Sequence, residues 1–307
     1  MKPHPPTTRA RTGLPRLIPH LVLVPLALLM LTPFVWLAVA SLKLPEDFVR
    51  SLWIPRNAEG VLEWSSLTLE NFRFILFGPA ESLPTEGSLS LRREPVGMAR
   101  ALFNSIFLAS TTALLATLCC AAAGYALAVF KFRGRKAITW LVLGALIIPP
   151  PLILAPGYEW LFRLGLLDSY LGLILPAAAP AFGVFLFRQA ALSSIPAQLM
   201  EAARLDGAGE LRTFLTIGLP LLRPMIGAFL MITYLATWNN FIQPQIVLQS
   251  SERFPLSVAI AQLRDLYYQD YGLLMAGTVL SVAPVLILFL VLQREFINGL
   301  TLGAVKG

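Results

Sequence analysis

Charged side chains are scarce in this 307-residue chain. Asp, Glu, Lys and Arg make up 13% of it, whereas hydrophobic residues make up 56%, and the mean hydropathy is +0.70. An ordinary soluble domain carries about 25% charged residues, so this composition excludes a soluble domain of this length. The apolar residues also occur in blocks long enough to cross about 30 Å of hydrocarbon, which takes roughly 20 helical residues. The chain is therefore expected to lie in a lipid bilayer.

Other absences narrow the function. The string G-x-x-x-x-G-K-[ST], which cradles phosphate groups, does not occur, so no nucleotide site is expected on this chain. No catalytic or metal site is expected either. A proton- or sodium-coupled carrier needs an ionisable group deep in a span, and the deep parts of the apolar blocks are almost free of charge. Glu159 is the open candidate for such a group, and an interfacial carboxylate is its alternative. The two cysteines, Cys119 and Cys120, are neighbours on one predicted helix, where their side chains diverge, so no structural disulfide is expected.

The apolar blocks predict an all-α polytopic membrane protein. No soluble domain, linker or strong repeat divides the chain, so residues 1–307 are expected to form one integral domain. The apolar run 21–40 exceeds the typical signal-peptide core of about 7–15 residues, which favours a retained anchor over a cleaved signal. The six predicted spans are 17–42, 101–130, 138–163, 170–191, 217–245 and 272–293.

Basic residues set the expected orientation. The tail 1–16 holds four cations and no acid, and the turn 131–136 is equally basic, so both are expected in the cytoplasm. Segment 43–100 carries more acidic than basic residues and is expected outside. Six crossings then place loop 192–216 and the tail 294–307 in the cytoplasm, with both termini. The net charge of +7 is spread over the ends of the spans, which indicates contact with membrane lipid and no nucleic-acid partner.

Loop 192–216 reads as a docking element. Ser193 or Ser194 can cap a helix whose first turn contains Pro196, Gly207 can end it, and a second short helix should follow. An amphipathic helix lying on the bilayer surface is the alternative. The loop is expected to offer an apolar surface and carboxylates to arginines of a partner protein, through Leu199, Met200, Ala203 and Phe214 and through Glu201, Asp206 and Glu210.

Polar side chains interrupt the fifth predicted span. Amides in hydrocarbon need partners, so these side chains should face another helix or a water-filled path. Tryptophan beside amides also suits a sugar, whose ring can stack and whose hydroxyls can bond; packing between helices is the alternative. The possible path-lining residues are Trp238, Asn239, Asn240 and Gln243. In the third span, Pro149, Pro150 and Pro151 should kink or unwind the helix, for packing or for gating.

The docking loop resembles the EAA loop of the membrane subunits of binding-protein-dependent ABC importers. In that family the loop forms a coupling helix that fits a cleft on the ATP-binding subunit. The residues that the resemblance assigns to coupling are Glu201, Ala202, Ala203, Asp206, Gly207, Ala208, Ile217, Leu219 and Pro220.

Four further strings are similar to those of the maltose-permease-like sugar subunits. They are Asn104-Ser105, the run from Gly165 to Tyr170, Trp238-Asn239-Asn240-Phe241, and the ending from Gly299 to Gly307. In that branch the C-terminal tail reaches toward the ATPase dimer, which implies a contact role, or else a frayed end, for Gly303, Ala304, Val305, Lys306 and Gly307.

The resemblance implies a permease subunit in the inner membrane of a prokaryote, which is not itself an enzyme. Its implied partners are a second homologous permease, a dimer of ATP-binding subunits that holds ATP and Mg, and an external solute-binding protein. A sugar or oligosaccharide is the expected cargo. The open alternatives are an importer of polyamines or other small solutes, a secondary carrier, and a membrane scaffold.

Overall fold

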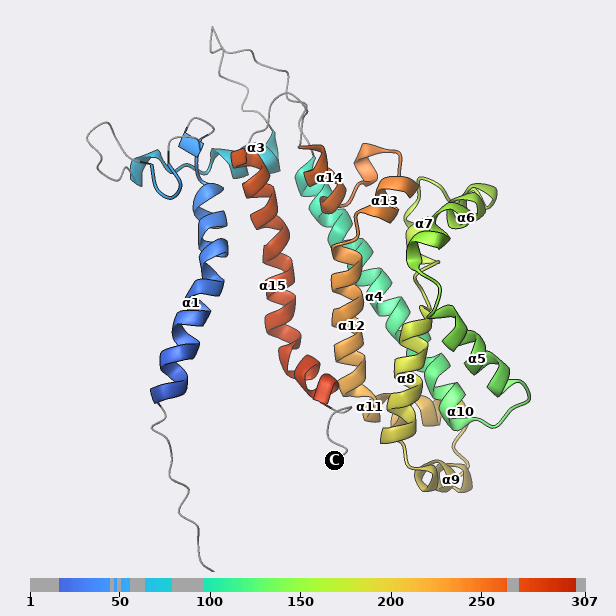
Figure 1. The fold of residues 1–307 in the computed structure, drawn as a ribbon. Coiled ribbons are helices and arrows are strands. Elements are labelled where there is room, and N and C mark those ends of the chain that lie inside the picture. The colour runs from blue at the N-terminus through green and yellow to red at the C-terminus, as the bar shows by residue number, and fades with distance from the viewer. Residues whose placement is uncertain are drawn as a thin grey trace, which may run out of the picture.

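A computed structural model describes residues 17–44, 47–48, 51–55, 64–78, 97–263 and 271–301. This part of the chain is helical and contains no strand. In Figure 1, α1, α15, α12 and α4 run along the length of the molecule, α8 lies along its lower half, and short helices lie at both ends. We call these ends the α9 end and the α13 end. In chain order the helices are α1 (Leu17–Ala40), η1 (Trp64–Ser66), α3 (Glu70–Phe77), α4 (Met98–Val129), α5 (Arg135–Ala145), α6 (Pro150–Arg163), α7 (Tyr170–Ile174), α8 (Ala181–Ser194), α9 (Ala197–Leu205), α10 (Glu210–Thr213), η2 (Phe214–Gly218), α11 (Leu219–Leu221), α12 (Arg223–Trp238), α13 (Ile242–Val247), η3 (Ser251–Arg253), α14 (Leu256–Gln262) and α15 (Tyr271–Thr301).

Three helices are individually long and apolar enough to cross a bilayer. They comprise Pro19–Ala40, Met98–Val129 and Tyr271–Gln293. Two bent pairs, α5 with α6 and α10–α11 with α12, raise the number to five if each pair is one span. The described chain is therefore a multi-helix membrane protein, as its composition predicts, with three to five candidate spans where the sequence predicts six.

Prolines explain where the predicted spans are broken. The third span bends by 107° between α5 and α6, and Pro149 and Pro150 begin α6 there, so the predicted kink is confirmed. The fourth predicted span, 170–191, is divided into α7 and α8, and Pro180 immediately precedes α8. A proline lacks the N–H that would continue the helix. Breaks of this kind are invisible to a count of apolar residues.

The centre of the bundle is packed through small residues. Helix α4 lies against α8 and α12, and α12 lies against α15. A Cβ atom at Gly124 would lie 2.6 Å from the Phe187 Cβ and from the Arg188 backbone nitrogen, so the backbones of α4 and α8 approach closely at this glycine. The free thiol of Cys120 is buried in the same cluster.

Helix α1 stands apart from this core. It contacts α15, and none of the residues in its apolar window is buried by the rest of the described chain. At the α13 end, the Asn71 amide of α3 donates to the carbonyl oxygens of Ser41 at 2.9 Å and Lys43 at 2.8 Å. The end of α1 at the α13 end of the molecule is thus tied to the bundle, while the apolar length of α1 is not covered by the described chain.

Candidate functional site

The predicted docking helix exists as α9 at one end of the bundle (Figure 1). Its predicted cap is wrong. Ser193 and Ser194 belong to the last turn of α8, and the Ser193 hydroxyl donates to the Ala190 carbonyl at 3.0 Å. Pro196, with extended backbone, is the residue that precedes α9, and no side chain caps the helix. The proline starts the helix because its fixed φ angle suits this position and it has no N–H to leave unpaired.

Gly207 ends α9 as predicted. Its φ angle is +74°, in the left-handed region, which is unfavourable for residues that have a Cβ atom. The Gly207 N–H donates to the Arg204 carbonyl at 3.1 Å, and the Ala208 N–H donates to the Ala203 carbonyl at 3.0 Å. These two bonds form a Schellman motif. The chain then turns into α10, the predicted second short helix.

The two faces of α9 differ from the expected surface. Met200 and Ala203 are buried, and the Tyr125 hydroxyl lies 3.5 Å from the Met200 sulfur. Phe214 packs on the Tyr125 ring, with ring centroids 5.0 Å apart. Met200 and Phe214 anchor the loop to α4, and Ala203 is buried as well, which corrects the prediction that these three residues face a partner. Of the predicted apolar surface, Leu199 is exposed as expected, at 40%. The most exposed apolar residues of the loop are Leu205, at 89%, and Leu211, at 70%.

The three carboxylates of the loop differ in their contacts. Glu210 forms an ion pair with Arg204, with Nε–Oε1 at 2.9 Å, so it is occupied within the loop. Glu201 and Asp206 are exposed, like Ala202, and Ala208 is half-buried. Ile217 lies in the π-helical turn η2, and Leu219 and Pro220 lie in α11, before the 78° bend into α12. The residues predicted for coupling therefore lie on α9, on the turn that follows it, and on η2 and α11 at the start of the next span.

The four possible path-lining residues lie in three different surroundings in the structure. Trp238 is 4% exposed and stacks on Tyr234, with ring centroids 5.7 Å apart, inside the core cluster shared with α4 and α15. Asn239 is exposed and donates to the Leu235 carbonyl. Asn240 and Gln243 bond to each other, with Nδ2–Oε1 at 2.8 Å. Of the four, Asn240 and Gln243 line the cavity that the structure describes between α4 and α12.

The cavity has a volume of about 300 Å³ and lies among α4, α12, α13 and the segment that enters α8. This is near the lower end of the usual range for small-molecule pockets, roughly 300–1,000 Å³. Apolar side chains form most of its wall. Its polar members are Ser105, Thr112, Thr233, Thr237, Asn240 and Gln243, and its aromatic members are Phe182 and Phe229.

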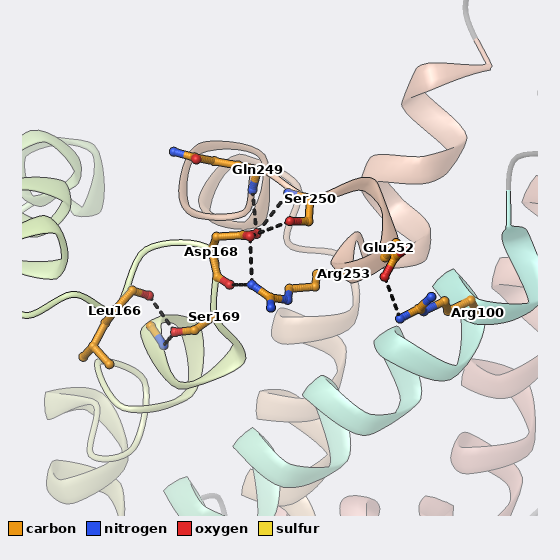
Figure 2. Close-up of polar contacts among 9 residues, drawn as sticks. Arg100, Leu166, Asp168, Ser169, Gln249, Ser250, Glu252 and Arg253 are labelled. Carbon is orange, nitrogen blue, oxygen red and sulfur yellow. Dashed lines mark hydrogen bonds and ion pairs between the residues drawn. The ribbon is translucent and has the colours of Figure 1, made fainter.

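Asp168 fastens two loops together at the α13 end, as Figure 2 shows. Its carboxylate accepts hydrogen bonds from the backbone N–H groups of Gln249 and Ser250, both at 3.0 Å, and from the Ser250 hydroxyl. Arg253 Nη1 contacts the carboxylate at 2.8 Å and also donates to the Asp168 carbonyl. The Ser250 hydroxyl most of all, then the two N–H groups and Arg253, lower the pKa of Asp168 to about 2. We call these contacts the Asp168 clasp.

The same segment is held from its other side by α4. The Asn104 amide donates to the carbonyls of Glu252 at 2.9 Å and Phe254 at 3.0 Å, and the Ser105 hydroxyl accepts from the Leu256 N–H at 2.7 Å. Arg100 pairs with Glu252 at 3.1 Å (Figure 2). Segment 249–256, here called the strap, is therefore fixed on both sides beside the cavity wall. The sequence showed Asn104 and Asp168 only as parts of matching strings, without a role.

The C-terminal tail and Glu159 are the remaining two site predictions. The tail residues Gly303, Ala304, Val305, Lys306 and Gly307 lie outside the described residues. Glu159 pairs with Arg163 four residues on, at 2.8 Å, and both side chains are more than half exposed. Within the ranges that the structure describes, no three potential metal ligands come together.

Comparisons with known proteins agree with this architecture. The chain is 36% identical to the arabinooligosaccharides transport system permease protein AraQ of Bacillus subtilis (strain 168), over 92% of each chain. It is 28% identical to the lactose transport system permease protein LacG of Rhizobium radiobacter, over 97% of this chain and 99% of the relative. A bacterial ABC transporter involved in the import of the acidic polysaccharide alginate shares the fold, with a TM-score of 0.73 and 21% identity over 91% of this chain and 95% of that chain.

The family match covers the region that contains the cavity, the clasp and the α9 loop. Residues 97–300 match the binding-protein-dependent transport system inner membrane component family. This range begins one residue before α4 and ends within α15. The chain therefore belongs to the family of binding-protein-dependent transport system inner membrane components.

Proposed function

We propose that this chain is one permease half of an ATP-driven importer, with six spans and both termini in the cytoplasm of a prokaryote. Family membership supports the importer class. In this proposal the three long helices and the two bent pairs would make five crossings, and α7 with α8 would make the sixth. The basic turn at 131–136 supports placing the α9 end in the cytoplasm.

The cargo in this proposal is a sugar or an oligosaccharide. A relative that is 36% identical over 92% of each chain is named for arabinooligosaccharides, and another is named for lactose. Similarity over nearly the full length makes a shared cargo class the simplest inference. An importer for polyamines, a secondary carrier and a scaffold have no comparable support.

The α9 loop carries the coupling part of the proposal. It presents exposed Leu205 and Leu211 beside exposed Glu201 and Asp206, which is an apolar centre with a charged rim, as in docking surfaces between proteins. Its buried side anchors it to α4 through Met200. A separate ATP-binding subunit, holding ATP and Mg, would receive this surface in a cleft. Movement of that subunit would then reach the bundle through α9.

The proposal assigns the remaining tasks of the importer to other subunits. A second homologous permease would complete the path and cover the apolar surface of α1, and an external binding protein would deliver the solute at the α13 end. The C-terminal residues 303–307 would touch the ATPase dimer. This chain would bind and orient its partners without catalysing a reaction.

The test compares Glu201→Lys and Leu205→Ser with wild type in proteoliposomes that contain the whole complex. Glu201→Lys reverses the rim charge and Leu205→Ser removes the most exposed leucine, so each should lower binding-protein-stimulated ATP hydrolysis and arabinotriose uptake by about tenfold. Glu159→Lys, with the same charge change at the opposite end of the bundle, is the matched control and should retain coupling. Normal coupling in both loop variants would contradict the role of α9. Absence of any uptake by the wild-type complex would contradict the sugar cargo.

A further inference from the structure

The cavity carries more information than its size. It is lined by hydroxyl groups, amides and apolar side chains, and none of the described residues that line it has an ionisable side chain. We propose that this cavity is a cargo site that accepts neutral, polyhydroxylated solutes and rejects ionised ones. The inference deepens the proposed function and rests on it for the identity of the occupant as cargo.

The polar groups of the cavity suit hydroxyl-bearing solutes. Asn240 and Gln243 bond to each other through one amide hydrogen and one carbonyl oxygen. In the part of the chain that the structure describes, the Gln243 amide nitrogen makes no further hydrogen bond, so it can donate to a solute. Thr233 and Thr237 lie one turn apart on α12 and both line the cavity. A hydroxyl both donates and accepts, so it can pair with a sugar hydroxyl in either sense.

The apolar wall suits the carbon face of a sugar. Phe182 and Phe229 line the cavity together with aliphatic side chains. Ligand pockets commonly combine such walls with a few fixed polar groups that set orientation. The polar groups here are held in place: the Ser257 hydroxyl donates to the Asn240 carbonyl at 2.9 Å, and the Ser105 hydroxyl is bonded to the strap.

An ion would lack compensation in this cavity. Moving a charged group from water into a mostly apolar site costs several kcal/mol unless an opposite charge receives it. A carboxylate or phosphate would need arginine or lysine, and a polyamine would need carboxylates. Asp168 and Arg253, the charged pair of the clasp, neutralise each other and do not line the cavity. The shared fold with an importer of an acidic polysaccharide therefore does not extend to the charge of the cargo.

The labelling rate of a cysteine introduced into the cavity tests this charge preference, and the natural cargo need not be known. Thr237→Cys is placed in a background with Cys119→Ala and Cys120→Ala, within the whole complex in proteoliposomes. Three methanethiosulfonates of similar length, ending in a hydroxyl, a sulfonate or a trimethylammonium group, are compared. The hydroxyl reagent should label roughly tenfold faster than either charged reagent, after correction for the rates with a free thiol, because the charged groups have no counter-charge in the cavity.

Two control positions and one added charge complete the test. Ser251→Cys, exposed on the strap, should react with all three reagents at similar corrected rates. Leu114→Cys, on the exposed face of α4, should react slowly with all three because a lipid-facing thiol rarely ionises. Adding Asn240→Asp to Thr237→Cys should bring the trimethylammonium reagent up to the rate of the hydroxyl reagent.

Equal labelling of Thr237→Cys by all three reagents would overturn the proposal. So would the absence of any labelling, since side chains of the partner permease would then fill the cavity. Uptake and stimulated ATP hydrolysis are measured on the same proteoliposomes. Loss of those activities with the charge preference intact would instead reject the proposed function.

Discussion

Asp168 and Ser250 lie 82 positions apart and are joined by two hydrogen bonds, because the carboxylate of Asp168 accepts from both the backbone N–H and the hydroxyl of Ser250. Asp168 adopts a φ angle of +50°, which is uncommon for a residue with a side chain. The network of bonds holds it there. The clasp thereby fixes the start of the strap to the loop that precedes α7.

Asp168→Asn should loosen the strap without unfolding the bundle. Asparagine tolerates the left-handed region, but it loses the negative charge and presents an amide to donors that need an acceptor. Hydrogen exchange at the Gln249 and Ser250 amides, measured by mass spectrometry, should become about tenfold faster. Glu159→Gln, which removes an exposed ion pair at the same end, should leave these amides unchanged. Unaltered protection in Asp168→Asn would mean that α4 alone holds the strap.

The clasp should also respond to acid in a defined direction. The folded pKa of Asp168 is about 2, below the usual value of about 3.9 for an unfolded aspartate. Its stabilising effect is therefore complete above pH of about 5 and declines as the pH falls through 3.9 toward 2. The difference in thermal midpoint between wild type and Asp168→Asn should be constant from pH 5 to pH 7 and shrink below about pH 4. A difference that grew in acid would refute this assignment.

Gly124→Ala should destabilise the packing of α4 on α8. The added methyl group would lie 2.6 Å from Phe187 and Arg188 atoms, and overpacking of this kind costs about 1–3 kcal/mol. Gly144→Ala is the matched control, because a Cβ atom there meets nothing within 4 Å inside α5. It should be neutral or stabilising by up to about 1 kcal/mol, through helix propensity. Thermal unfolding of the detergent-solubilised complex distinguishes the two.

Gly207→Ala should impair coupling through backbone strain alone. A Cβ atom at Gly207 has open space around it, but the φ angle of +74° disfavours alanine by about 1–2 kcal/mol. Gly209→Ala, two residues on, also has open space and an ordinary φ angle of −65°. Stimulated ATP hydrolysis should fall in the first variant and stay near wild type in the second. Equal activities would show that the Schellman turn is dispensable for coupling.

The sequence predicted the parts of the structure that depend on local chemistry. Gly207 was identified from its place after an apolar helix, and the three prolines from 149 to 151 marked the bend before α6. Both features follow from the backbone properties of single residues. The helices α9 and α10 followed from the same local signals.

Other features depend on contacts between distant segments. Met200 reads as a surface residue of a short amphipathic helix, but in the structure it is buried and contacts Tyr125 of α4. Trp238 and Asn240 are two positions apart, yet one lies in the core and the other at the cavity, because the helix ends between them. The role of Asp168 depends on a segment some 80 residues later. No local pattern records such pairings, which are set by how the helices pack.

The bonds from Asn104 to the strap span 148 and 150 positions. During synthesis, α4 emerges long before residues 252–256 exist, so the side of the cavity that the strap borders cannot be assembled until most of the chain has left the ribosome. Contacts of such long sequence separation form late, since chain closure must precede them. A chain that ends before residue 252 therefore lacks both of the bonds by which Asn104 holds the strap beside the cavity.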